Sequence, residues 1–181
     1  MTDSLDDGLD RAVDTLLALA AERPWREISL RAIAEAADLP LADLYGRADG
    51  KSALLAYLSA RLDKAALATA ATPSDDAHDR LFDAVMARVE AMESHRAALI
   101  AIARDASPLA LVAHFPPTAR ALLEAAGIDA TAPRLAAMTA VWARTAQVWR
   151  DDEGALNRTM AEIDKRLKQM RGRLRRIGAG F

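Results

Sequence analysis

The fold is decided by residues 28–58, which read ISLRAIAEAADLPLADLYGRADGKSALLAYL. Ser29 is a good N-cap, and the apolar residues that follow it recur at helical spacing as far as Asp38. Asp38 tolerates the left-handed conformation that can end a helix, and Pro40 suits the first turn of the next helix. The stretch therefore predicts a helix, a tight turn, a short helix and, from about Lys51, a long helix.

Helical patterning continues over the whole chain. Hydrophobic residues make up 52% of it and aromatic residues only 4%, and the apolar content is mostly Ala and Leu, which favour helix over strand. Further helices are predicted before Pro24, from Ser74 to about Arg104 with an irregularity at Ser94, from Ser107, from Pro116 to Gly127, from Thr131 to about Asp152, and from Gly154 to about Ile177. We therefore predict an all-α protein of about nine helices.

Charge is distributed unevenly along the chain. Residues 1–60 carry six Lys or Arg against eleven Asp or Glu (net −5), whereas residues 161–181 carry seven against two (net +5). There is no Cys, which excludes disulfides and thiolate metal sites and fits a reducing cytoplasm. The three His lie far apart, and no catalytic or phosphate-binding motif is recognisable. We therefore predict a cytoplasmic protein that is not an enzyme and needs no cofactor.

Residues 28–58 resemble the N-terminal domain of TetR-type transcriptional regulators. The matching positions are Ser29-Leu30-Arg31, Ile33-Ala34, Ala37, Leu44-Tyr45, Lys51 and Leu54. The resemblance implies a helix-turn-helix DNA-binding-like domain of three helices over residues 1–60, and a helical ligand-binding and dimerisation domain over residues 61–181. It further implies a repressor-like regulator that binds double-stranded DNA as a homodimer and responds to a small apolar ligand.

The same resemblance places the DNA contacts on Pro40 to Arg47 and on flanking residues. The predicted DNA-binding residues are Arg31, Leu41, Asp43, Tyr45, Arg47 and Lys51. Base edges are usually read by Arg, Lys, Asn or Gln, and the acidic charge of residues 1–60 opposes binding to phosphates. A second reading therefore stays open, in which the TetR-like fold serves a lipid-binding or membrane-associated accessory protein that does not read DNA.

Large apolar side chains in the second domain predict a ligand pocket. The candidates are Met86, Phe115, Met138, Trp142 and Trp149. Adaptable Met and large aromatic side chains suit an apolar ligand, although the same residues at helical spacing are also typical of an ordinary core. Trp142 and Trp149 lie seven residues apart and therefore on one face of a helix.

The last predicted helix carries the longest apolar seam in the chain, formed by Ile163, Leu167, Met170 and Leu174 and flanked by Lys and Arg. Such a seam fits a dimer interface or the protein's own core, and its cationic flanks also fit an anionic membrane surface. Residues 141–167 resemble, more loosely, TetR-fold accessory proteins of ubiquinone biosynthesis that bind isoprenoid lipid. That second resemblance implies a membrane-facing role for the basic tail.

Overall fold

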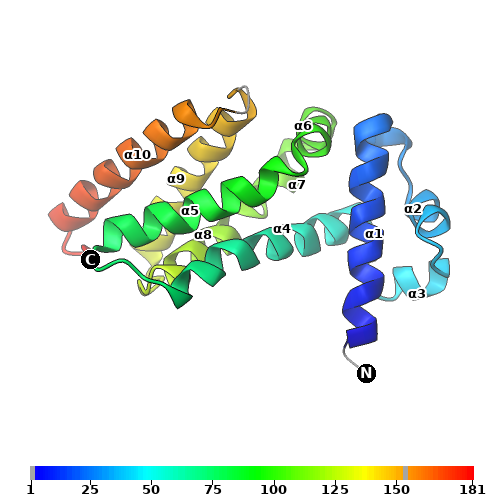
Figure 1. Cartoon of the computed structure of the whole chain (residues 1–181), viewed down its shortest axis with the longest axis horizontal. Helices are drawn as coiled ribbons and strands as arrows, with labels where there is room; N and C mark the ends of the chain where they lie inside the picture. Colours follow the sequence, from blue (N-terminus) through cyan, green and yellow to red (C-terminus); the bar gives the residue numbers. More distant parts are fainter. Residues whose placement is uncertain (1–2, 153–154) are drawn as a thin grey trace. The chain divides into compact units, whose positions relative to one another are not determined.

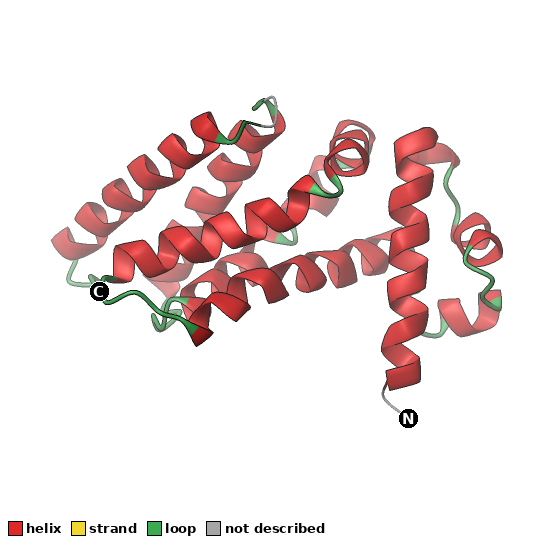
Figure 2. Cartoon of the chain, viewed as in Figure 1, coloured by secondary structure: helices red, strands yellow, loops and turns green. Residues whose placement is uncertain are grey.

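The protein is helical throughout residues 3–152 and 155–181, which are the residues that the computed structural model describes. Figure 2 shows no strand in this part of the chain. The elements are α1 (Asp3–Glu22), η1 (Trp25–Glu27), α2 (Leu30–Ala36), α3 (Leu41–Tyr45), α4 (Lys51–Ala68), η2 (Thr69–Ala71), α5 (Ala77–Glu93), α6 (Arg96–Asp105), α7 (Pro108–Val112), α8 (Phe115–Ala125), α9 (Ala132–Arg150) and α10 (Asn157–Arg176), where η marks a 3-10 helix. The predicted all-α class is confirmed.

The described residues contain ten α-helices rather than about nine, because the helix predicted up to Arg104 is divided. The division falls at Ser94, where the sequence predicts an irregularity. The Ser94 hydroxyl donates to the carbonyl of Ala91 at 3.1 Å, and His95 leaves the helical region with φ −119° and ψ 15°. Ser side chains that bond to the local backbone compete with helix continuation, which accounts for the break.

The chain folds into two compact units. The first contains Met1–Ala60 and His95–Leu111, and the second contains Arg61–Ser94 and Val112–Phe181. The first unit also contains α6, which the division predicted from the sequence, residues 1–60 and 61–181, does not include. In that unit α2 and α3 lie on one side of α1, and α6 contacts α1 and η1 (Figure 1).

Local bonds define both ends of α2. The Ser29 side chain accepts a hydrogen bond from the backbone N–H of Ala32 at 3.1 Å, which caps the start of the helix. Asp38 has φ 52°, and the N–H of Leu39 bonds back to the carbonyl of Ala34 at 2.9 Å. This is the Schellman arrangement that closes a helix and turns the chain. The predictions for Ser29 and Asp38 are confirmed.

The helix α3 follows Pro40 directly and is shorter than the predicted span of residues 40–47. Its inner side chain Leu44 is 2% exposed. It joins a core made by α1, α2 and α4, with Leu16, Ile33, Ala48, Leu54 and Leu58. The helix-turn-helix is therefore held by one small apolar core inside the first unit.

The second unit has a larger core, in which α9 packs against α8 and α10, and α5 packs against α8 and α10. Its most deeply buried side chains include Leu81, Leu122, Leu123, Met138, Ile163 and Leu167. Gly127, with φ 67°, follows α8 at the predicted end of that helix. Gly154, predicted to precede the last helix, lies outside the described residues. None of the helices in the described ranges has the length and hydropathy needed to cross a bilayer.

Candidate functional site

The outer face of the helix-turn-helix is the first candidate site. Tyr45, at the end of α3, is 60% exposed, and Ala42 and Asp43 on the same helix are also exposed. Arg31 is exposed on α2, while Leu41 is half-buried. The structure therefore brings the predicted DNA-binding residues of α2 and α3 to the surface of the first unit. That these residues contact DNA stays a prediction.

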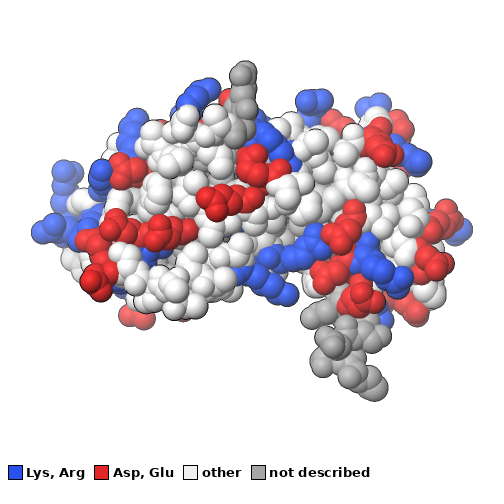
Figure 3. Space-filling view, in the orientation of Figure 1, with Lys and Arg blue, Asp and Glu red and all other residues white. Residues whose placement is uncertain are grey.

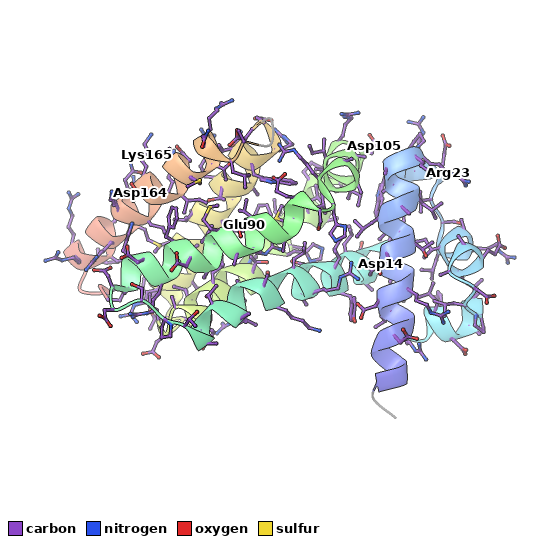
Figure 4. All side chains as sticks on the ribbon, viewed as in Figure 1. Asp14, Arg23, Glu90, Asp105, Asp164 and Lys165 are labelled. Atoms are coloured by element: carbon purple, nitrogen blue, oxygen red, sulfur yellow. The ribbon has the colours of Figure 1, made fainter. Side chains whose placement is uncertain are left out.

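Lys51, a predicted phosphate contact, is already held by the corner at Trp25. Its ammonium group donates to the backbone carbonyl of Trp25 at 2.6 Å and lies 4.2 Å from the centroid of the Trp25 ring. The backbone N–H of Trp25 donates in turn to the carboxylate of Asp105 on α6 at 3.3 Å; Figure 4 labels Asp105. Burial lowers the pKa of Lys51. Lys51 therefore ties the start of α4 to η1, whatever else it binds.

Lys51→Met is expected to destabilise the first unit by about 1–2 kcal/mol, because it removes one charge-assisted hydrogen bond and one cation–π contact but keeps most of the apolar stem. Urea unfolding followed by Trp fluorescence measures the change. The matched control is Lys64→Met, since Lys64 is exposed further along α4. Equal stabilities of the two variants would show that the Trp25 contact contributes nothing.

Arg47, the only cation among residues 40–47, lies against α1. A Cβ atom placed at Gly8 would collide with the guanidinium Nη1 of Arg47, so that guanidinium occupies the space beside Gly8 that any other residue would fill. Gly8 is the sixth residue of α1, and because Nη1 is the far end of a flexible side chain, the contact does not by itself require glycine there. In this position Arg47 braces the end of the helix-turn-helix against α1.

The charge around the helix-turn-helix is mixed. On the face shown in Figure 3, acidic and basic side chains alternate over the part of the first unit that holds α1 to α3, and the described residues of this face form no continuous basic area there. Asp38, Asp43 and Asp49 are all exposed. On this face the arrangement of charges therefore does not reverse the acidic balance of residues 1–60.

A buried ion pair in the second unit is the other candidate site, and the sequence analysis missed it. Asp63 on α4 and Arg88 on α5 are 6% and 4% exposed, and the guanidinium Nε donates to the Asp63 carboxylate at 2.5 Å. Thr118 on α8 completes the group, because its hydroxyl donates to the second Asp63 oxygen at 3.3 Å. The sequence does contain a sign of this ion pair: Arg88 lies three residues after Val85, on the apolar stripe of α5, where a charged side chain is expected to be buried.

Apolar and weakly polar groups surround this ion pair. The Arg88 guanidinium stacks 4.2 Å from the ring centroid of Trp142, and its Nη1 donates to the sulfur of Met92 at 3.0 Å. Burial lowers the pKa of Arg88, while the charge of Asp63 acts in the opposite direction. Among the described residues, two buried polar atoms have no hydrogen-bond partner: His114 Nε2 and Thr145 Oγ1. Unsatisfied buried polar groups are costly and are often found where a ligand or an ordered water binds.

Acidification is expected to destabilise the second unit from about pH 6.5 downward. Burial, helped by the charge of Arg88, lowers the pKa of His114 from its usual 6.5. Below pH 6.5 the unfolded chain therefore binds more protons than the folded one, so the free energy of unfolding falls as the pH falls toward the folded pKa. The measurement is urea unfolding as a function of pH.

His114→Gln is the control for this pH dependence, because it removes the titrating group. The carboxylates with lowered pKa values, Asp76, Glu162 and Asp164, lose their stabilising contribution only at lower pH, since their unfolded pKa values are 3.8, 4.5 and 3.8. A decline near pH 6 that persists in His114→Gln would contradict the assignment to His114.

Four of the five predicted ligand-pocket residues are buried in the core of the second unit. Met138, Trp142 and Trp149 are 0%, 2% and 4% exposed, and Met86 is also buried. Trp142 and Trp149 share the inner face of α9, and the Trp149 indole N–H donates to the carboxylate of Glu93. Phe115 is half-buried at the start of α8. In this structure the first four are part of the core, and their contact with a ligand stays a prediction.

The apolar seam of α10 is buried within the single chain. Ile163, Leu167, Met170 and Leu174 are at most 4% exposed within the single chain. The helices α5 and α9 cover α10, so the protein's own core accounts for the seam. Core packing is the alternative that the single chain contains. That these four residues also meet a second subunit or a membrane stays a prediction; Met170 and Leu174 border the groove described next.

The outer surface of α9 and α10 remains open to solvent. It carries a groove of about 270 Å³ lined by small and apolar residues with basic residues beside them: Pro133, Ala137, Ala140, Val141, Arg166, Gln169, Met170, Arg173, Leu174 and Ile177. The two helices are pinned by Glu162, which accepts from Arg144 at 3.1 Å and from Arg166 at 2.7 Å. The bond from Arg144 therefore links α9 to α10, whereas the bond from Arg166 lies within α10.

Solved structures show which fold this is. The chain is similar to a TetR transcriptional regulator from Rhodococcus sp. RHA1, with a TM-score of 0.69, 15% identity, and coverage of 91% of this chain and 96% of that one. It is also similar to the dihydroxyacetone kinase operon activator DhaS, with a TM-score of 0.58, 8% identity and coverage of 93% and 96%. No family model matches the sequence, and no curated protein matches it.

The protein therefore has the TetR-like fold that residues 28–58 predict. Both of these structural neighbours are transcription regulators rather than enzymes. At such low identity the likeness establishes the fold, and function has to be argued from the surfaces of this chain.

Proposed function

We propose that the protein is a transcriptional regulator that binds double-stranded DNA as a homodimer and responds to a small apolar ligand. The observation that carries the proposal is the exposed face of α3, on which Tyr45 is 60% exposed while Leu44 is 2% exposed. A short helix held by its inner side chains and presented by a preceding helix and turn suits insertion into a major groove. The fold shared with two regulators supports the same reading.

Selection of bound sequences from random duplex DNA at physiological salt tests the DNA-binding proposal. We expect enrichment of a palindrome whose half-sites mirror the two-fold symmetry of a dimer. We also expect a shallow dependence of affinity on salt, because few cations surround α3 and each phosphate contact adds to the salt slope. If no sequence were enriched, sequence-specific DNA binding would be refuted. The alternative function, a lipid-binding or membrane-associated accessory protein, would then remain.

The dimer is proposed to form through the outer face of α9 and α10. Ala137 and Ala140 are small enough to let a second pair of helices approach closely, and Ile177 beside them is 67% exposed. Ala140→Arg is expected to convert the dimer to a monomer in sedimentation velocity, because a long cation cannot be accommodated between closely packed helices. Ala56→Arg, at an exposed position of α4, is the matched control. A wild-type monomer, or an Ala140→Arg dimer, would contradict this interface.

The ligand response is proposed to arise in the second unit, around the buried ion pair. His114 Nε2 and Thr145 Oγ1 have no hydrogen-bond partner among the described residues, so each is available to a polar atom of a largely apolar ligand. Such a ligand would shift DNA affinity only through a difference in its affinity for two conformations of the dimer. Because Trp142 stacks on Arg88, we expect an effector that releases DNA to change the Trp fluorescence.

A further inference from the structure

The basic C-terminal half of α10 borders a surface pocket that the proposed regulator function does not use. The pocket lies between this half of α10 and the start of α5 and has a volume of about 450 Å³. It is lined by Asp76, His78, Asp79, Lys168, Arg171, Gly172 and Arg175. Basic side chains gather over the end of α10 at the left of Figure 3, with acidic side chains beside them.

The buried seam of α10 determines where its cations stand. Lys168, Arg171 and Arg175 each follow a seam residue by one position, so they form a stripe along one edge of the buried face. With the seam inside the core, this stripe has no apolar surface to insert into a membrane. What remains is a set of three cationic side chains on one wall of a pocket.

Gly172 keeps this pocket open. It lies inside a 20-residue helix, where glycine is less favourable than alanine, and a Cβ atom at this position would meet nothing within 4 Å. Helix packing therefore does not require the glycine. Its effect is to leave space in the wall between Arg171 and Arg175.

Two of the three cations form ion pairs with carboxylates of the chain. Arg171 bonds to Asp76 at 3.3 Å, and Lys168 bonds to Asp164 at 2.7 Å; Figure 4 labels Asp164 on α10. The Asp76 carboxylate also caps α5 by accepting from the His78 N–H at 2.6 Å. These pairs are solvent-exposed, and exposed ion pairs are weak. A ligand with more negative charge and more oxygen acceptors than one carboxylate can therefore displace them.

We infer that this pocket binds a phosphate or diphosphate group, with Lys168, Arg171 and Arg175 as its cationic wall. Arg side chains hold phosphate oxygens through paired N–H donors. A phosphate dianion carries more negative charge than the single carboxylate that Arg171 or Lys168 now contacts. The N-terminus of α5 does not add to this attraction, because the Asp76 carboxylate caps it and Asp79 lies in its first turn, so the attraction depends on the three cations. The group could be carried by a soluble metabolite or by a phospholipid headgroup, since both present the same oxygens.

Calorimetric titration of the full-length protein with inorganic pyrophosphate tests the inference. We expect binding that Arg175→Gln weakens by roughly tenfold or more. Gly172→Leu should weaken it at least as much, because it fills the pocket while leaving every charge in place and favours the helix. Lys165→Gln is the matched control: Lys165 is on the same helix and exposed, but does not line the pocket.

A second arm distinguishes the two sources of the phosphate. Vesicles of phosphatidylcholine with phosphatidate should retain the wild-type protein, and not Gly172→Leu, if headgroups enter the pocket. Pyrophosphate binding without vesicle retention assigns the site to soluble ligands. The inference is overturned if pyrophosphate does not bind, or if Gly172→Leu binds it as wild type does, because the attraction would then be only diffuse surface charge.

Discussion

Asp63→Ala is expected to lower the free energy of unfolding of the second unit by about 3–5 kcal/mol, because it leaves Arg88 charged, buried and without its carboxylate. Arg88 is 4% exposed and has little access to water. Its stacking on Trp142 and its contact with Met92 do not replace a counter-charge. Urea unfolding followed by the fluorescence of Trp142 measures the loss.

The double variant Asp63→Leu with Arg88→Met separates the cost of breaking the pair from the net value of the pair. Removing both charges and filling the space with apolar side chains should restore most of the stability, since buried ion pairs are often replaceable in this way. If Asp63→Ala proved as stable as the wild type, the prediction would be contradicted, because a buried and charged Arg88 would then not need the Asp63 carboxylate. If the double variant were as unstable as the single one, the pair would contribute net stability.

Tyr45→Ala is expected to weaken binding to the selected palindrome by roughly a hundredfold, on the proposal that the protein binds DNA as a dimer. The loss of one contact to DNA lowers the affinity by about tenfold, and a dimer loses this contact in both half-sites. Tyr45 is 60% exposed, so the substitution leaves no cavity and should hardly change stability. Fluorescence anisotropy with labelled duplex measures the affinity.

Two further variants make this test specific. Tyr57→Phe is the matched control, because the Tyr57 hydroxyl donates to Asp10 at 3.2 Å inside the first unit. Asp43→Asn should act in the opposite direction and tighten DNA binding, since it removes an exposed negative charge from α3. Unchanged affinity in both Tyr45→Ala and Asp43→Asn would show that α3 does not face the DNA.

Helix boundaries were predictable because they depend on residues close together in the chain. Ser29 bonds to a backbone group three residues away, and Asp38 adopts the left-handed conformation that its side chain tolerates. The break at Ser94 has the same local origin, although the sequence predicts an irregularity there rather than two separate helices. The resemblance to TetR-type regulators rests on this local pattern, and the solved structures confirm the fold.

The candidate sites were predictable only in part. Tyr45 is exposed on the face that the sequence predicts to face DNA, but Lys51 and Arg47 have contacts inside the first unit that no local pattern indicates. The ion pair of Asp63 and Arg88 joins residues 25 positions apart in sequence. An Arg on an apolar stripe hints at a buried partner, but the identity of that partner depends on how two helices pack.

The sequence by itself determined the all-α class, the helix-turn-helix and the segregation of charge, because turns, caps and apolar periodicity act within a few residues. The tertiary structure decided what the seam of α10 packs against, which helices share a unit and which charges are buried together. An apolar stripe has the same pattern whether its own core, a second subunit or a membrane covers it. Only the packing of α5 and α9 against α10 places that stripe in the core and leaves its cations around an open pocket.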